Sequence, residues 1–245
     1  MTTYSIIIPC RDEEENVNII SENILKNCKY SNYEIIFIND FSSDKTEQNL
    51  INLSKKFKNI SYFNNNEKGL GGAIKLGLGK SIGNYITILM ADSADSMDDL
   101  NLYFKLIMEN QYDAIFGSRF IKGGKTVDYP FLKLILNRFG NYLTKILFFS
   151  DYDDFTNSFK IYKKDVVSHF YPIVSEDFNI FLELPLKTIS RGFKYKIVPI
   201  KYYNRTIGEA KFKIKELGSR YLFTLLYCFL EKILLRKKKQ IWIIF

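Results

Sequence analysis

Residues 85–95 read Tyr-Ile-Thr-Ile-Leu-Met-Ala-Asp-Ser-Ala-Asp, an apolar run that ends in two carboxylates, Asp92 and Asp95. The run predicts a buried β-strand because it is short, rich in β-branched residues and followed by polar ones. Carboxylates at the carboxyl end of such a strand face the crevice in which open α/β sheets bind ligands. Their oxygens suit Mg²⁺ or Mn²⁺, which use few carboxylates and complete their shell with substrate phosphates. Alternatively, Asp92, Ser93 or Asp95 caps a helix predicted at 97–110.

The same alternation of strand and helix extends through the first half of the chain. Apolar periodicity predicts strands at 4–9, 33–38, 60–64 and 84–90, and helices at 13–27, 45–57, 69–78 and 97–110. Strands that alternate with helices form a mostly parallel sheet with right-handed crossovers. The alternation fades after this, with a strand at 114–117, helices at 131–149 and 178–190, and a strand at 194–198. We therefore predict the α/β class, with a Rossmann-like, mostly parallel sheet flanked by helices.

Composition limits the partners. The 245 residues are 47% hydrophobic and 16% aromatic, which provides ample core, and the formal net charge is +8. This charge favours anionic partners, but the basic residues are dispersed and form no recognised nucleic-acid module, so a nucleic-acid binder is disfavoured. The cysteines Cys10, Cys28 and Cys228 are far apart, and His169 is the single histidine. We therefore expect neither a zinc site nor a disulfide framework, and we expect the protein to reside in a reducing cytoplasm. The first residues do not resemble a signal peptide.

Polar side chains follow three of the predicted strands. The loop at 9–16 follows the first strand, Asn39 and Asp40 follow the second, and Asp92 and Asp95 follow the fourth. Acidic residues in the first loop also suit a helix N-terminus through the helix dipole. That alternative does not explain why polar residues follow all three strands. We predict a crevice for a nucleoside diphosphate, in which Asp40 bonds the base or ribose and the acidic pair holds a metal ion on the diphosphate.

A glycine-rich stretch at 69–73 precedes the third helix. It lacks the Gly-Lys-Ser/Thr ending of a P-loop and does not follow the first strand, as a dinucleotide-binding fingerprint would. ATP phosphoryl transfer and dinucleotide binding are therefore disfavoured. The glycines either allow a close approach of two backbones or contact the ligand, and the sequence leaves both readings open.

Further motifs occur in order along residues 4–235. The first half contains Pro9-x-x-x-Glu13-x-x-Asn16 and Ile38-Asn39-Asp40-x-Ser42-x-Asp44-x-Thr46. The second half contains Gly117-Ser118-Arg119-Phe120, Asn137-Arg138, Asp154-x-Thr156-Asn157-Ser158-Phe159-Lys160, Glu183-Leu184-Pro185-Leu186-Lys187 and Arg205-x-x-Gly208-x-x-Lys211. In this order they resemble the family 2 glycosyltransferases of GT-A fold, and within them the polyprenol-phosphate (dolichol-phosphate) mannosyltransferase branch. Met90-Ala91-Asp92 stands where that family has Asp-x-Asp.

The resemblance implies a role for each matching residue. Residues expected to contact the donor nucleotide are Pro9, Arg11, Glu13, Ile38 and Asp40. Ala91 and Asp92 are expected at the donor diphosphate, with Asp95 as the second metal ligand. The expected catalytic residues are Asp92, Arg119, Arg205 and Lys211, because cations stabilise charge on phosphates. The expected acceptor contacts are Arg119, Arg138 and Asp154. Without the resemblance, a solvated or salt-bridged surface position is the favoured interpretation of Arg119 and Arg205.

The implied reaction is a displacement at the anomeric carbon, with inversion, of a nucleoside diphosphate from a GDP- or UDP-sugar. A phosphate acceptor is already ionised and needs no strong base, whereas a hydroxyl acceptor needs one within hydrogen-bond reach. Asp154, Glu176 and Asp177 are the candidates for that base, or they simply serve turns and caps.

The C-terminal segment suggests a membrane surface. Residues 221–235 are mostly apolar, 236–239 are basic and 241–245 are apolar again. As a helix the first run would be about 22 Å long, short of the roughly 30 Å hydrocarbon core, so an interfacial helix is predicted. Packing on the domain, or an oligomer contact, would explain it equally well. We therefore divide the chain into a glycosyltransferase domain at 1–215 and an apolar helix with a basic tail at 216–245.

These observations predict a metal-dependent inverting glycosyltransferase of cell-envelope biosynthesis, cytoplasmic and peripheral to the inner face of the membrane. Its expected partners are a nucleotide sugar, a polyprenyl phosphate and the membrane surface. One alternative is transfer to a saccharide hydroxyl in envelope polysaccharide assembly. Another is a non-catalytic, membrane-associated scaffold that retains the fold, given the altered Asp-x-Asp.

Overall fold

The computed structural model describes residues 4–109, 111–127, 129, 131–203 and 214–241. Side chains are described in the same ranges except at 132, 133, 203, 214–217 and 235–241. Arg205 and Lys211, both predicted to bind phosphate, therefore lie outside the described residues, as do the last four residues of the tail.

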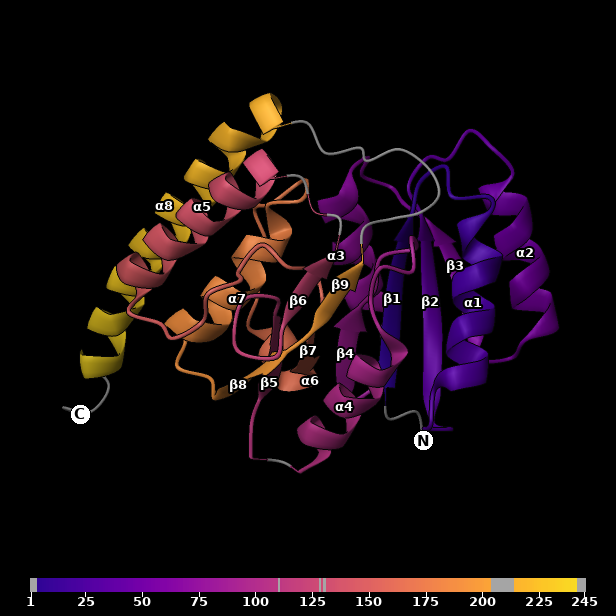
Figure 1. The fold of residues 1–245 in the computed structure, drawn as a ribbon, viewed down its shortest axis with the longest axis horizontal. Helices are drawn as coiled ribbons and strands as arrows, with labels where there is room; N and C mark the ends of the chain where they lie inside the picture. Colours follow the sequence, from indigo (N-terminus) through magenta and orange to yellow (C-terminus); the bar gives the residue numbers. More distant parts are fainter. Residues whose placement is uncertain (1–3, 110, 128, 130, 204–213, 242–245) are drawn as a thin grey trace.

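A seven-stranded sheet runs through the centre of the molecule in the order β3-β2-β1-β4-β7-β5-β8 (Figure 1). Its strands are β1 (Tyr4–Cys10), β2 (Tyr33–Asn39), β3 (Ile60–Asn64), β4 (Tyr85–Ile88), β5 (Ala114–Ser118), β7 (Lys160–Lys163) and β8 (Tyr195–Pro199). Neighbours are parallel except β7, which runs antiparallel to both β4 and β5. The predicted α/β class and the mostly parallel sheet are confirmed.

The strand order places the crevice. From β1 the chain moves outward through β2 to β3 and then returns to the other side of β1 as β4. Strand order therefore reverses between β1 and β4, and ligands of open α/β sheets bind beyond the carboxyl ends of strands at such a reversal. The loop after β1 and the acidic pair after β4 flank this point.

Helices cover both faces of the sheet (Figure 1). The helices are α1 (Asn16–Asn27), α2 (Thr46–Lys56), α3 (Leu70–Lys80), α4 (Met97–Met108), α5 (Phe131–Phe148), α6 (Lys164–Ser168), α7 (Ile180–Ser190) and α8 (Ile214–Ile241). Apolar residues of α1, α2 and α4 form the core on one face, and those of α3, α6 and α7 form the core on the other. Helices α5 and α8 lie side by side outside α7.

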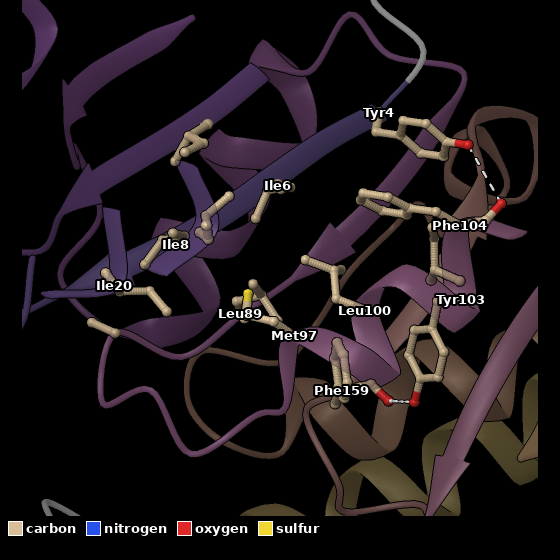
Figure 2. Close-up of a cluster of buried hydrophobic side chains, with 14 of the residues drawn as sticks. Tyr4, Ile6, Ile8, Ile20, Leu89, Met97, Leu100, Tyr103, Phe104 and Phe159 are labelled. Atoms are coloured by element: carbon tan, nitrogen blue, oxygen red, sulfur yellow. Dashed lines mark hydrogen bonds between the residues drawn. The ribbon is translucent and has the colours of Figure 1, made fainter. Parts of the chain in front are cut away.

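The core around α4 fixes the position of the acidic loop that precedes it. The Tyr4 ring stacks on Phe104 with 3.8 Å between centroids, and the Tyr4 hydroxyl donates to the Phe104 carbonyl at 3.4 Å (Figure 2). The Tyr103 hydroxyl donates to the Phe159 carbonyl at 3.0 Å. Helix α4 is thereby held against both β1 and the segment that enters β7, and its first turn directly follows Asp95.

Several elements were not expected. They are β7, the short helix α6, and the parallel pair β6 (Lys125–Val127) and β9 (Lys201–Tyr203). All are short, and the strands pair with partners far away in the sequence, so no local periodicity marks them. The predicted apolar run at 221–235 lies within the longer α8, whose Thr224 and Cys228 are buried against the domain. Among the described residues, no helix is long and apolar enough to cross a membrane.

Candidate active site

The loops after β1 and β2 are bonded to each other. The Glu13 N–H donates to Thr46 Oγ1 at 2.8 Å, and the Asp12 N–H donates to Ser42 Oγ at 3.0 Å. In return, the Ser43 N–H donates to Asp12 Oδ1 at 2.7 Å. The polar residues that follow Asp40 in the second motif therefore hold the first loop in place. These bonds join the carboxyl ends of β1 and β2 into one rigid unit.

Backbone strain concentrates at this edge. Three of the four non-glycine residues with positive φ among the described residues are Asp12 (+49°), Phe41 (+55°) and Ser93 (+56°). Each lies in the loop that follows β1, β2 or β4. Left-handed conformations are unfavourable for such residues and cluster at ligand-binding sites, where the surroundings hold them. The strained edge coincides with the crevice predicted from the strand order.

Asp40 is buried beneath the glycine-rich turn. Its Oδ1 accepts bonds from Asn65 Nδ2 at 2.8 Å and from the Gly69 N–H at 2.9 Å. Gly69 has φ +124°, and a Cβ there would lie 2.7 Å from the Glu176 carbonyl oxygen. A Cβ at Gly71 would lie 2.6 Å from the carbonyl carbon of Glu176. Close backbone approach thus accounts for both glycines, and a ligand contact is not needed to explain them.

The other residues predicted to contact the donor lie at the same edge. Pro9 pairs with Ile38 in the β1–β2 register, one residue before each strand ends. Ala91 is buried directly before the acidic pair. Arg11 and Glu13 are half-buried in the loop after β1. The structure therefore brings the predicted donor residues together, whereas their contact with a nucleotide stays a prediction.

The acidic pair contains an unsatisfied group. Asp92 is half-buried, and its Oδ1 accepts the Ala94 N–H at 3.2 Å. Asp95 is only 7% exposed, and the backbone bridge between Asp95 and Tyr202 of β9 covers it. In the described part of the chain, Asp95 Oδ2 and Ser93 Oγ are buried without a hydrogen-bond partner. Among the described residues, Ser190 Oγ and Arg191 Nη1 at the end of α7 are buried without a partner as well. Buried polar atoms are nearly always bonded, so Asp95 Oδ2 and Ser93 Oγ, which lie at the crevice, are candidates for ligand contacts.

The charge state of Asp95 agrees with this view. Burial, together with the negative charge of Asp92, raises the pKa of the Asp95 carboxyl to about 7. A divalent cation would supply the partner that Asp95 Oδ2 lacks, so the residues present fit a metal ion. Within the described residues, no group of three or more His, Cys, Asp or Glu side chains is arranged to hold a metal. Substrate phosphates or water would have to complete the shell, as is common for Mg²⁺.

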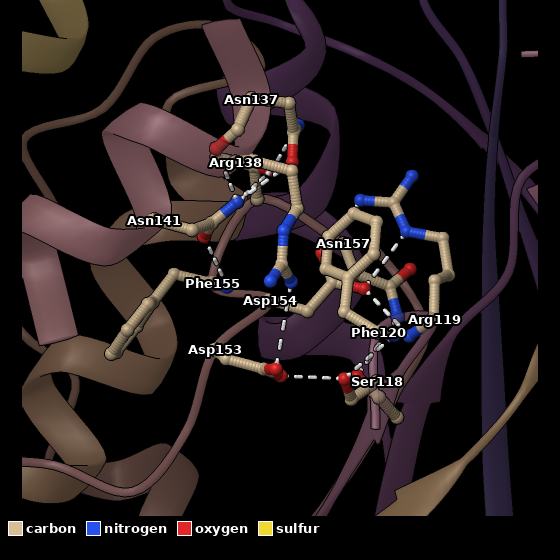
Figure 3. A network of polar contacts seen from close by, with 12 residues as sticks. Ser118, Arg119, Phe120, Asn137, Arg138, Asn141, Asp153, Asp154, Phe155 and Asn157 are labelled. Carbon is tan, nitrogen blue, oxygen red and sulfur yellow. Dashed lines mark hydrogen bonds and ion pairs between the residues drawn. The ribbon is translucent and has the colours of Figure 1, made fainter. Parts of the chain in front are cut away.

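Arg119 and Asp154 form a buried ion pair (Figure 3). Arg119 Nη2 donates to Asp154 Oδ1 at 2.6 Å, and Arg119 Nε donates to Oδ2 at 2.8 Å. The Arg119 backbone N–H also donates to Oδ2, at 3.0 Å. Arg119 is 7% exposed and Asp154 is fully buried. Such a bidentate, charge-assisted pair fixes the guanidinium in one orientation.

This pairing changes the interpretation of Asp154. Both of its oxygens are bonded and inaccessible, so the structure argues against direct contact with an acceptor and against a role as general base. Asp154 instead positions Arg119. Arg119 is a buried, paired arginine rather than a solvated one. Its guanidinium faces the rings of Phe120, Tyr129 and Tyr202 at 5.2, 5.6 and 5.4 Å.

Arg138 lies on α5, on the other side of the Phe120 ring. Its guanidinium is 4.5 Å from the centroid of that ring, and Nη1 is 3.7 Å from Asp153 Oδ2. The side chain is half exposed, unlike that of Arg119. Asp153 is held by Ser118, whose hydroxyl donates to it at 2.6 Å. Both arginines expected at the acceptor, Arg119 and Arg138, therefore lie against one aromatic ring.

The remaining candidates for a base lie on the donor side. The Glu176 backbone carbonyl accepts the Gly71 N–H at 2.8 Å. Asp177 pairs with Arg220 of α8 at 2.8 Å.

Sequence reasoning missed Asn65 and Tyr202. Asn65 directly follows β3, so the rule used for the other strand ends could have found it, whereas nothing local links Tyr202 to Asp95.

The family model for glycosyl transferase family 2 matches residues 5–170 of the chain. A dolichol-phosphate mannosyltransferase from Pyrococcus furiosus is 29% identical over 215 residues, which cover 86% of this chain and 59% of that protein. A polyprenol monophosphomannose synthase from Mycolicibacterium smegmatis is 24% identical over 232 residues, covering 88% of this chain and 86% of that protein. The chain thus spans less than two thirds of the first relative and most of the second.

Solved structures share the fold at low identity. Glucosyl-3-phosphoglycerate synthase from Mycobacterium tuberculosis, crystallised with UDP, superposes with a TM-score of 0.70 at 13% identity, covering 93% of this chain and 80% of that one. S. aureus TarS residues 1–349 give a TM-score of 0.62 at 16% identity, covering 83% and 60% of the two chains.

Proposed function

The chain belongs to glycosyl transferase family 2, and we propose that it moves a sugar from a nucleotide-sugar donor to a polyprenyl-phosphate acceptor. The observation that carries the proposal is the buried, unsatisfied Asp95 beside Asp92 at the point where strand order reverses. Two neighbouring carboxylates at this position suit a metal ion bound to a diphosphate. The similarity to two polyprenol-phosphate mannosyltransferases supports the choice of acceptor.

Asp92 and Asp95 would hold Mg²⁺ or Mn²⁺. When bound, the cation would stabilise the negative charge that develops on the leaving nucleoside diphosphate. Asp95 needs that cation to remain ionised near neutral pH, since burial and Asp92 hold its pKa at about 7. The M. tuberculosis structural neighbour has been crystallised with Mn²⁺ and UDP, which supports a divalent ion in this fold.

The donor nucleotide would lie over the carboxyl ends of β1 and β2. Asn65 and Gly69 fix the orientation of Asp40 there through Oδ1, and its second oxygen would bond a base or ribose without reorganisation. Arg11 and Glu13 border the same edge. The GDP- or UDP-sugar would thus extend from Asp40 across the reversal point towards Asp92.

In the proposed reaction an acceptor phosphate oxygen forms a bond to the anomeric carbon. The bond from that carbon to the diphosphate oxygen breaks on the opposite face, which inverts the configuration, and its electron pair leaves with the nucleoside diphosphate. The acceptor is already ionised, so no general base is required. This agrees with Asp154, whose two oxygens are buried and bonded to Arg119.

Arg138 and the exposed faces of two helices support a lipid acceptor. Exposed apolar side chains on α5 are Phe131, Ile135, Leu136, Phe139, Tyr142, Leu143 and Ile146. Those on the neighbouring α8 are Leu222, Phe223, Leu226, Leu230, Ile233 and Leu234. Large apolar surfaces mark interaction sites, and a lipid phosphate held beside α5 would meet Arg138. We propose that the protein binds the cytoplasmic face of the membrane through this surface and the basic tail.

A transfer assay tests the acceptor. The protein is incubated with Mn²⁺ and either GDP-mannose or a panel of UDP-sugars, with a polyprenyl phosphate or a free oligosaccharide as acceptor. We expect a polyprenyl-phosphate sugar and inverted linkage. Transfer to the oligosaccharide alone would assign the protein to polysaccharide assembly. Absence of transfer and of donor hydrolysis with every donor would favour a scaffold.

Liposome co-sedimentation tests the membrane proposal. Neutralising Lys237, Lys238 and Lys239 and deleting residues 241–245 should weaken binding to anionic vesicles, since each basic residue contributes about 1 kcal/mol at low salt. Transfer to a long polyprenyl phosphate should fall more than transfer to a short soluble analogue. Equal sedimentation of the wild-type chain and the variant would exclude membrane binding through the tail.

A further inference from the structure

Two charged side chains are buried in α7, away from the crevice. Glu183 and Lys187 are one helical turn apart and both 0% exposed, and Lys187 Nζ lies 2.8 Å from Glu183 Oε1. They belong to the motif at 183–187, to which the proposed reaction gives no role. A buried ion pair is costly to desolvate and is seldom the most stable choice for a core, so its presence needs another reason.

Each partner is bonded to the backbone of the segment that precedes α7. Glu183 accepts the Val174 N–H at 3.0 Å and the Ser175 N–H at 2.8 Å. Lys187 Nζ donates to the Phe170 carbonyl at 2.8 Å and also to the Pro172 carbonyl. Four backbone groups of an irregular segment are thus satisfied by one buried pair. Because the segment has no sheet or helix bonds of its own there, the pair determines its path.

The far end of that segment contacts the glycine-rich turn. The Gly71 N–H donates to the Glu176 carbonyl at 2.8 Å, directly after the residues that Glu183 holds. The approach is so close that a Cβ at Gly69 or Gly71 would collide with this backbone. The Gly69 N–H in turn donates to Asp40 Oδ1 at 2.9 Å. A continuous chain of bonds therefore runs from Glu183 to the carboxylate proposed to bind the donor.

We propose that Glu183 and Lys187 are positioning residues for the nucleotide donor, acting through residues 174–176 and the glycine-rich turn on Asp40. The inference rests on the proposed donor role of Asp40. If the segment shifted, the turn would follow, since the two backbones are in direct contact. Asp40 would then lose a bond that fixes one of its oxygens, and preorganisation for the nucleotide would be reduced.

Isothermal titration of the full chain with UDP and with GDP, in the presence of MnCl₂, tests this proposal. Glu183→Gln removes the charge opposite Lys187 and replaces one acceptor with an NH₂ group that cannot bond a backbone N–H. We expect the Kd of the better nucleotide to rise about 3- to 30-fold, the range for mutations that act through a contact network. In transfer assays the KM for the donor should rise, while the KM for the acceptor stays the same.

Ile107→Ala is the matched control. Ile107 is fully buried in α4 on the other face of the sheet, so this change creates a core cavity without touching the segment or the turn. It should lower the unfolding temperature and leave nucleotide affinity unchanged. A purely structural role for Glu183 predicts the same pattern for Glu183→Gln, and that pattern would overturn the proposal.

Gly71→Ala provides a second, independent variant. It leaves the buried pair intact and breaks the contact between the glycine-rich turn and residues 174–176. It should therefore weaken the binding of the same nucleotide to a similar degree. The double variant should be no weaker than the worse single one, because both act on one chain of contacts. Unchanged affinity in Gly71→Ala overturns the proposal even if Glu183→Gln does not fold. A wild-type chain that binds neither nucleotide would instead refute the proposed function.

Discussion

Two buried aspartates at one edge of the sheet have opposite surroundings. Asp154 uses both oxygens to hold Arg119, at 2.6 and 2.8 Å, whereas Asp95 Oδ2 has no hydrogen-bond partner in the described part of the chain. Both are almost inaccessible, with exposures of 0% and 7%. Burial alone therefore does not identify a binding residue. An aspartate with both oxygens bonded supports its neighbours, whereas a buried oxygen without a partner, such as Asp95 Oδ2, is where we propose that a ligand binds.

The largest expected effect comes from breaking the satisfied pair. Asp154→Ala leaves Arg119 buried without a counter-charge, which should cost about 3–5 kcal/mol in the free energy of unfolding. Urea denaturation measures it. Asp153→Ala is the control, because the neighbouring Asp153 is partly exposed and lies 3.7 Å from Arg138. Similar losses in the two variants would contradict the distinction.

The comparison extends to the cations. Arg119 is committed to Asp154, so we expect Arg205 and Lys211 to contact the reacting phosphates. Arg205→Ala and Lys211→Ala should each slow transfer by roughly 10²-fold or more, the usual cost of removing a group that stabilises transition-state charge. The urea midpoint should hardly change. Normal turnover in both variants would remove these two residues from the site.

Substitution of Asp92 or Asp95 should affect binding rather than folding. Asp92→Asn and Asp95→Asn should weaken Mn²⁺-dependent nucleotide binding by roughly 10- to 100-fold, as losses around metal sites do. Because Asp95→Asn removes an uncompensated buried charge, the free energy of unfolding without metal should not fall. The measurements are calorimetry with UDP and GDP, and urea denaturation. Nucleotide affinity that neither substitution nor EDTA alters would refute the metal assignment.

The smallest effect is a dependence of stability on pH. The pKa of Asp95 rises from 3.8 to about 7 on folding, chiefly through burial and the charge of Asp92. Between these values the folded state binds more protons than the unfolded state, so stability without metal should fall as pH rises through this window. Asp95→Asn should remove that part of the slope. An unchanged slope in the variant would show that other groups produce it.

The architecture was largely predictable because its signals are local. The alternation of strand and helix up to residue 118 follows from hydrophobic periodicity over short windows, and strand ends were predicted to within two residues. A parallel sheet then brings the carboxyl ends of its strands to one edge. That is why the loop at 9–16, Asp40 and Asp92 could be grouped before any contact was known, whereas Ile38 was added only by the resemblance to the family.

The unpredicted part depends on contacts between distant residues. Strand β7 lies between β4 and β5 and pairs Thr87 with Ile161, and its four residues carry no distinctive pattern. Tyr202 reaches Asp95 across more than 100 positions in the sequence. Asp154 was expected to face the acceptor, but in the fold its carboxylate turns to Arg119. Residue type indicates what a side chain can bond, whereas its actual partner depends on the whole packing.

By itself the sequence determined the α/β class, the family and the edge of the sheet at which polar side chains gather, because periodicity and motif order are properties of neighbouring residues. Only the tertiary structure decided which of those side chains have all their hydrogen-bond partners and which have a polar atom without one. Asp95 and Asp154 are the same residue type in similar polar contexts. Their difference arises from burial and from partners brought together by long-range packing, and neither quantity is encoded in any short stretch of the chain.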